Sequence, residues 1–301
     1  MFFPPFLVFS SLTISSPPVL LLVLAFISAT RAENYLTPKE LFVALLSAAI
    51  HDIDHHGLNN TFHKNSLSQL DAKYNSSSTL ERHHIDVCFE IMENANHNPL
   101  VHWSPEEQAK ARLEITRMVL MTDMSRHNDL VKVLELRAAR RLRRPFRAQR
   151  RGSDAFDFSD ADEKKSYLEA MLHAADISNS VRPFAQSEVL ATLLAVEFNA
   201  QTAKEKAMGL PIAAFMVQPT IAEVCMGEVD FLKFVAKPYW TALFLCFDDV
   251  EPELIALESN ILSWDQLAER VGNDPGMLSE PLIERSSRNL EASSMATALD
   301  G

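Results

Sequence analysis

The stretch LLSAAIHDIDHHGLNN, residues 45–60, joins an apolar helical pattern to a dense group of histidines and carboxylates. Upstream of it, Thr37, Pro38 and Glu40 are typical of a helix start, with the threonine as N-cap and the glutamate closing a capping box. One apolar face then follows at helical spacing, made by Leu41, Phe42, Leu45, Leu46 and Ala49. We therefore expect a helix that delivers His51 and Asp52 at its C-terminal end.

Further helical patterns follow, and no convincing alternating strand pattern appears. Ser104 and Glu107 mark another capped helix start, and a strongly apolar helix is expected to end near Asp176. Two long helical patterns then occupy residues 186–206 and 228–247. The sequence predicts an all-α fold.

The composition limits the chemistry that the chain can perform. Its 301 residues, 47% of them hydrophobic, are enough for one substantial core. The 7 glycines form no glycine-rich loop, so a phosphate cradle of the Walker or dinucleotide type is excluded. A net charge of -12 disfavours nucleic acid as a partner. Three widely spaced cysteines indicate neither a disulfide framework nor a zinc ribbon.

The two ends of the chain are expected to stand apart from the main domain. Residues 1–34 begin with thirty uncharged positions and resemble a signal sequence or an artefactual start, and residues 273–301 read as a disordered tail. The domain itself is assigned to residues 35–272. Within it, the arginines from Arg137 to Arg151 lack an apolar period, which predicts an exposed, mobile loop or a weak contact with a membrane or a partner.

The seven residues from His51 to Gly57 hold three histidines and two aspartates. An isolated His-Asp pair is usually a surface or capping feature, but this density favours a metal site, because buried charges need partners or an ion. A carboxylate can bridge two divalent ions, and Asp52 is the candidate bridge. Glu81, close to His83 and His84, is suited to orienting water or other ligands.

Four motifs occur in the order and approximate spacing of one family: LLSAAIHDIDHHGLNN at 45–60, LERHHIDVCFEIM at 80–92, VLMTDMSRH at 119–127 and HAADISNSVRPF at 173–184. From about Tyr35 to Trp264, the chain resembles the catalytic domain of class I 3',5'-cyclic nucleotide phosphodiesterases. That resemblance implies a compact multi-helix domain of the His-Asp (HD) metallohydrolase type. His56 stands where the family usually has a proline.

The resemblance also implies roles for individual residues. His51, Asp52 and Asp176 match metal ligands for two divalent ions, zinc together with magnesium or manganese. His55 and Glu81 match the pair that supports the water network around the second ion. The stretches containing Thr122, Asp123 and Asn179 match the lining of the pocket.

The segments EFNAQTAKEKAMGLP, 197–211, and EVDFLKFVAKPYW, 228–240, resemble the family's base-pocket helices. Phe231 matches the aromatic that stacks on the purine, with Leu194 as the opposite apolar wall, although a core role for Phe231 stays open. Glu228 stands where the family has a glutamine that reads the purine edge. An ionised carboxylate can only accept hydrogen bonds, so the choice between cyclic AMP and cyclic GMP is open.

A Tyr-His-Asn-x-x-His segment that the family places upstream of the His-Asp motif is absent, and residues 1–34 contain no histidine. In the family this segment supplies a metal ligand and the proton-donating histidine, so we expect an N-terminally truncated domain. The expected activity is hydrolysis of cyclic mononucleotides to 5'-monophosphates at a cytoplasmic or membrane-associated location. Two alternatives stay open: a non-catalytic protein that binds a nucleotide or a partner, and another HD-type phosphohydrolase.

Overall fold

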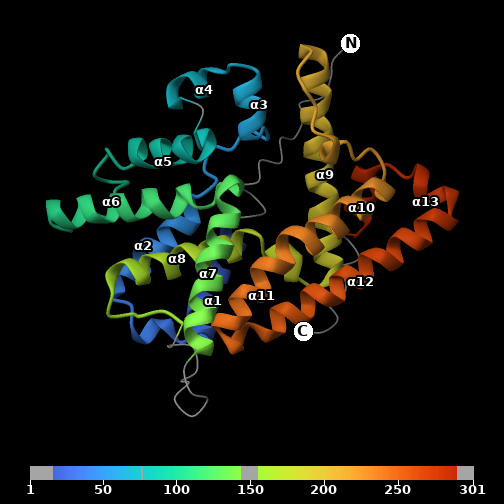
Figure 1. Ribbon diagram of the computed structural model, residues 1–301. Coiled ribbons are helices and arrows are strands. Elements are labelled where there is room, and N and C mark those ends of the chain that lie inside the picture. The colour runs from blue at the N-terminus through green and yellow to red at the C-terminus, as the bar shows by residue number, and fades with distance from the viewer. Residues whose placement is uncertain (1–15, 76, 144–154, 290–301) are drawn as a thin grey trace. The chain divides into compact units, whose positions relative to one another are not determined.

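The computed structural model describes residues 16–75, 77–143 and 155–289 (Figure 1). Within these ranges every regular element is a helix, which confirms the predicted all-α fold. None of these helices combines the length and the apolar character needed to cross a membrane. The chain divides into two compact units, Met1–Asp176 and Ile177–Gly301.

The first unit contains the following helices: α1 (Ser16–Ala29), α2 (Pro38–Ile50), α3 (Asn60–Asn65), α4 (Gln69–Tyr74), α5 (Thr79–Ile91), α6 (Pro105–Leu120), α7 (His127–Leu142) and α8 (Ala161–Asp176). Short 3-10 turns lie at Ala32–Asn34 and Met124–Arg126. Apolar side chains of α2, α5 and α6 form one core, with Val43, Ile85 and Ile115 buried in it.

The start of α2 follows the sequence prediction. The Thr37 hydroxyl accepts a hydrogen bond from the Glu40 backbone N–H at 3.2 Å, and the Thr37 N–H donates to Glu40 Oε2 at 2.7 Å. This capping box satisfies two N–H groups that a helix start would otherwise leave unpaired. The helix ends at Ile50, so His51 is the first residue beyond its last turn.

Helix α1 corrects the expectation for residues 1–34. It packs against α2 and α8, and Val23 and Ile27 are fully buried. The Thr30 hydroxyl also lies 2.5 Å from the Tyr167 hydroxyl of α8. Residues 16–34 therefore fold with the first unit, because their apolar side chains complete its core. Residues 1–15 lie outside the described part of the chain.

The described part of the arginine stretch, residues 137–142, is helical. Arg137 and Arg140 lie on α7, where each donates through Nη1 to Oε1 of Glu163, at 2.8 and 2.7 Å. Arg141 is buried. The prediction of an exposed, mobile loop is wrong for residues 137–142, because a carboxylate pairs with these arginines and lets them lie along a packed helix. Residues 144–151 lie outside the described ranges.

The second unit contains α9 (Phe184–Met208), α10 (Ile221–Phe231), α11 (Lys237–Cys246), α12 (Glu251–Asn273) and α13 (Pro275–Ser279). A π-helical turn, Leu232–Ala236, joins α10 to α11. A 3-10 turn at Ser178–Val181 is fixed from two sides. Trp240 Nε1 donates to Ser180 Oγ at 3.0 Å, and Asn260 Nδ2 donates to Ser180 O at 3.0 Å.

The predicted disordered tail is also wrong in part. Helix α13 follows α12, and residues 282–289 are helical as well. Arg285 is buried and donates to Glu188 Oε1 of α9 through Nε at 3.0 Å and Nη2 at 2.6 Å. This paired charge and the buried Leu282 attach the segment to the second unit. Residues 290–301 are outside the described part of the chain.

Candidate metal centre

His51 presents a bare nitrogen at the end of α2. Its Nδ1 lies 2.8 Å from the Ala48 carbonyl, so Nδ1 carries the proton that is donated to this oxygen. In the neutral imidazole, Nε2 is then left with a free lone pair. The side chain is fully buried, and Nε2 has no hydrogen-bond partner among the described residues. A buried acceptor of this kind is what a metal ion requires.

Two carboxylates face this nitrogen. Asp52 Oδ2 and Asp176 Oδ1 each lie 3.4 Å from His51 Nε2. Asp176 is the last residue of α8, so the ends of two helices converge here. Ligand atoms from all three side chains lie within 4.8 Å of one another. The structure thus brings together the three residues that the sequence suggested as metal ligands.

The electrostatics of the cluster also suit a cation. Burial acts to lower the pKa of His51, but the negative charges of Asp52 and Asp176 outweigh it and raise this pKa to about 9. Burial raises the pKa of Asp52, and the neighbouring Asp176 carboxylate adds to the rise. Two acidic groups this close therefore need positive charge between them, from a protonated His51 or from a metal ion. The nitrogen and oxygen donors fit a divalent metal ion.

His84 of α5 supports the same cluster. Its Nδ1 donates to the Ile53 carbonyl at 2.6 Å, and its Nε2 lies 3.9 Å from Asp52 Oδ1. Burial lowers the pKa of His84 to about 3, so the ring is neutral. This contact holds the turn that carries Asp52 against α5.

Glu81 and His55 were expected to act as a pair, and each has its own local partner. Asn60 Nδ2 donates to Glu81 Oε2 at 3.0 Å, while the Gly57 N–H donates to His55 Nδ1 at 3.1 Å. Burial raises the pKa of Glu81 to about 7, although the Asn60 hydrogen bond opposes this. Asn60 was not assigned a role from the sequence, although it is the last residue of the motif at 45–60.

Thr122 and Asp123 lie between α6 and the 3-10 turn at Met124–Arg126, and their side chains bind local groups. Thr122 Oγ1 donates to the Val119 carbonyl at 2.8 Å. Asp123 Oδ2 accepts from Ser78 Oγ at 2.7 Å, just before α5 begins. Asp123 therefore ties α6 to the start of the helix that carries Glu81 and His84.

A buried histidine pair was missed by the sequence reasoning. His127 Nδ1 and His173 Nε2 lie 2.9 Å apart, so one ring donates to the other. Burial lowers the pKa of His173 to about 4, which keeps this ring neutral. The sequence contained a signal for this pair, because both histidines belong to motifs of the family. His127 is the last residue of the motif at 119–127, and His173 is the first residue of the motif at 173–184.

The remaining candidate residues lie in the second unit. Asn179 is in the 3-10 turn, and its Oδ1 is a buried atom without a hydrogen-bond partner in the described structure. Leu194 on α9 is 42% exposed. Glu228 and Phe231 are partly buried and one helical turn apart on α10, which places them on one face. Burial raises the pKa of Glu228 to about 7.

Comparison with known proteins decides the family. The profile of the 3'5'-cyclic nucleotide phosphodiesterases matches residues 16–257. The chain belongs to this family. The match starts within α1, in agreement with the packing of that helix in the first unit. The resemblance inferred from the four motifs is thereby confirmed.

Individual phosphodiesterases support the same assignment. The chain is 31% identical over 229 residues to a 3',5'-cyclic-AMP phosphodiesterase, isoform F, of Drosophila melanogaster. It is 28% identical over 223 residues to the high affinity cGMP-specific 3',5'-cyclic phosphodiesterase 9A of Mus musculus. These alignments cover 76% and 74% of this chain but only 33% and 39% of the two relatives.

A solved phosphodiesterase structure shares the fold. The phosphodiesterase domain of the Salpingoeca rosetta rhodopsin phosphodiesterase is 30% identical, with a TM-score of 0.77. The match covers 86% of this chain and 75% of that domain. The all-helical arrangement is therefore that of a phosphodiesterase catalytic domain.

Proposed function

We propose that this chain hydrolyses 3',5'-cyclic nucleotides to 5'-monophosphates at a centre for two divalent ions. The observation that carries the proposal is the buried Nε2 of His51, which has no hydrogen-bond partner among the described residues. It lies 3.4 Å from Asp52 Oδ2 and 3.4 Å from Asp176 Oδ1. Membership of the phosphodiesterase family supplies the substrate class.

The donors at the centre favour particular metals. One imidazole nitrogen with two carboxylates would suit a tightly held zinc ion, and the remaining oxygen of Asp52 would suit a second ion, magnesium or manganese. Ions bound there can activate a water for attack on phosphorus and neutralise charge on the phosphate oxygens.

Glu81 and His55, close to the centre in the sequence motifs, would exchange protons during the reaction. Glu81, whose pKa is about 7, can take up or release a proton near neutral pH, and Asn60 fixes the orientation of its carboxyl group. The Gly57 N–H donates to His55 Nδ1, so the neutral ring carries its proton on Nε2 and can donate from there.

The face of α10 is the proposed nucleotide pocket. Phe231 would stack on the purine, with Leu194 as the second apolar wall and Asn179 as a hydrogen-bonding group. Because the pKa of Glu228 is about 7, much of this group is protonated at neutral pH. A protonated carboxyl both donates and accepts, as an amide does, so Glu228 can serve either purine.

The test is turnover by the purified 301-residue chain, loaded with zinc and magnesium, on cyclic AMP and cyclic GMP. Phosphorus NMR should show the 5'-monophosphate, and Asp176→Asn should abolish it. A nucleoside triphosphate is the control substrate and should be left intact. Hydrolysis of the triphosphate instead of the cyclic nucleotides would assign the chain to a different HD-type phosphohydrolase.

A non-catalytic nucleotide-binding role is the second candidate. Glu228 and Phe231, one helical turn apart on α10, can bind a purine whether or not the phosphate is hydrolysed. Binding of cyclic nucleotide in a fluorescence titration, with no 5'-monophosphate formed, would establish this role and reject the enzymatic one.

A further inference from the structure

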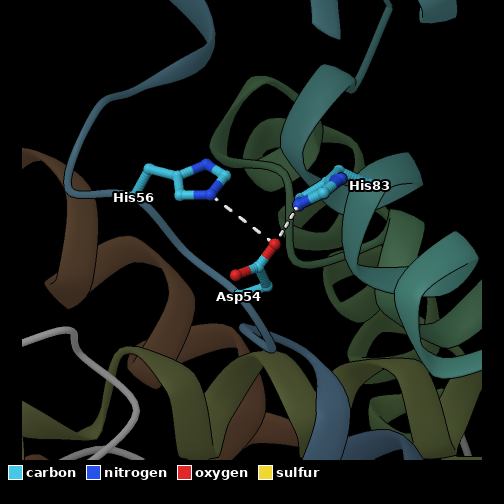
Figure 2. Close-up of side chains that lie close together, drawn as sticks. All are labelled: Asp54, His56 and His83. Atoms are coloured by element: carbon cyan, nitrogen blue, oxygen red, sulfur yellow. Dashed lines mark hydrogen bonds and ion pairs between the residues drawn. The ribbon is translucent and has the colours of Figure 1, made fainter. Parts of the chain in front are cut away.

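We propose that Asp54, His56 and His83 form a separate, outer binding site for one divalent transition-metal ion of the zinc type. These three side chains form a second group of convergent ligand atoms, all within 4.8 Å of one another. Figure 2 shows the carboxylate of Asp54 between the two imidazole rings. This site shares no ligand with His51, Asp52 and Asp176.

The distances are close to those of a metal site. Asp54 Oδ2 lies 2.8 Å from His83 Nε2 and 3.5 Å from His56 Nε2. Ligand atoms placed about 2.0 to 2.2 Å from a tetrahedral zinc ion lie about 3.3 to 3.6 Å from each other. The distance from Asp54 Oδ2 to His56 Nε2 already fits this range. The distance from Asp54 Oδ2 to His83 Nε2 has to increase by about 0.5 Å, which a small rotation of either side chain can supply.

The backbone of the turn after α2 separates Asp54 from the inner cluster. Asp54 has a left-handed backbone with φ of 60°, an uncommon conformation for a residue with a side chain. In the turn after α2, Asp52 contacts His84 while Asp54 contacts His83. Neighbouring residues of a helix point about 100° apart, so α5 supports the inner cluster with His84 and the outer one with His83.

A hydrogen bond alone does not account for the arrangement. It would explain the contact between His83 and Asp54, but His56 also turns its Nε2 toward the same oxygen. The His56 and His83 rings lie 5.4 Å apart between centroids, tilted by 32°. The side chains of Asp54 and His56 are 51% and 48% exposed, so an ion from solvent can reach them and retain water as further ligands.

The ligand set selects the class of metal. Two imidazole nitrogens and one carboxylate suit zinc, nickel, copper or iron(II), whereas magnesium and calcium prefer oxygen ligands. An ion held here would also link the turn carrying Asp52 to α5, which carries Glu81 and His84. It would therefore stabilise the surroundings of the inner centre without being part of it.

The test is zinc titration of the whole chain after chelator dialysis, followed by calorimetry. His56→Ala should lose one zinc equivalent, or bind it at least about 10-fold more weakly. His102→Ala is the matched control, because His102 is exposed and outside both ligand groups. It should titrate like the unmodified protein. His56 is itself half exposed, so its replacement should leave the fold intact by circular dichroism.

Further variants separate the two sites. Asp176→Asn should remove an inner equivalent, and the Asp176→Asn, His56→Ala double variant should lose both. Cobalt absorption should change in His56→Ala and His83→Gln alike, and millimolar magnesium should not displace the outer ion. Identical titrations for His56→Ala and His102→Ala would overturn the proposal. So would a zinc-dependent doubling of mass in light scattering that His56→Ala abolishes, because the ion would then bridge two chains.

Discussion

Nε2 of His51 lies 3.4 Å from Oδ1 of Asp176, although one residue follows α2 and the other ends α8. If this pair holds a metal ion, Asp176→Asn keeps the shape and removes the charge. We expect zinc affinity to fall at least about 10-fold, measured by calorimetry at fixed pH. Asp129→Asn, at an exposed surface pair, is the control. Equal affinities in the two variants would remove Asp176 from the ligand set.

Helix α1 should contribute to the stability of the first unit. Phe26 is 3% exposed, so Phe26→Ala leaves a cavity and should lower the free energy of unfolding by about 3 kcal/mol. Leu21 lies on the same helix and is 62% exposed, and Leu21→Ala should cost about 0.5 kcal/mol or less. Urea unfolding compares the two. Similar small effects would show that α1 is not part of the core.

Glu228 should make stability depend on pH. Its pKa is about 7 in the folded chain and 4.5 ordinarily, so the folded protein binds this proton more tightly than the unfolded chain does. Its stabilising contribution is complete below about pH 4.5 and is lost as the pH rises through about 7. Glu228→Gln cannot ionise. Relative to the unmodified protein, we expect it to gain about 2 kcal/mol of unfolding free energy between pH 5 and pH 9.

The control for this pH dependence is Glu258→Gln, at a side chain that is 55% exposed. Urea unfolding at both pH values should show no comparable gain for this variant. The unfolding free energy of Glu228→Gln could instead differ from that of the unmodified protein by the same amount at pH 5 and pH 9. In that case burial does not raise the pKa of Glu228, and the argument about its protonation fails.

Phe231 should bind the base. Loss of one stacking aromatic costs roughly 1 to 3 kcal/mol, so Phe231→Ala should weaken binding of cyclic AMP and cyclic GMP by about 5- to 150-fold. Fluorescence titration measures this without turnover. Phe234→Ala is the matched control, because Phe234 is 74% exposed in the adjoining π-helical turn. Equal affinity in both variants would mean that Phe231 is only a packing residue.

Local signals in the sequence were sufficient for several helix starts and for the grouping of the three candidate metal ligands. The capping residues Thr37 and Ser104 start helices as predicted, because a cap depends on residues three positions apart. The structure brings His51, Asp52 and Asp176 together as expected from ordered motifs. Asn60 escaped notice because its partner, Glu81, lies on another helix and no spacing rule connects them.

The wrong expectations share a physical cause. Residues 16–34, the arginines of α7 and the segment after α12 were judged by composition alone. Each of these segments is held by a residue distant in the sequence. Thr30 contacts Tyr167, Arg137 pairs with Glu163, and Arg285 pairs with Glu188. Tertiary contacts of this kind override local composition, and one sequence does not reveal them.

The π-helical turn at Leu232–Ala236 has a consequence for variation in chain length. A π turn holds one more residue than an α-helical turn, so it absorbs a single inserted position without shifting the helices on either side. Deleting one residue within it would restore α-helical geometry and leave Phe231 and the buried Trp240 in the same relative orientation. Relatives that lack this extra position should therefore still present the residue equivalent to Phe231 on the same face of the helix.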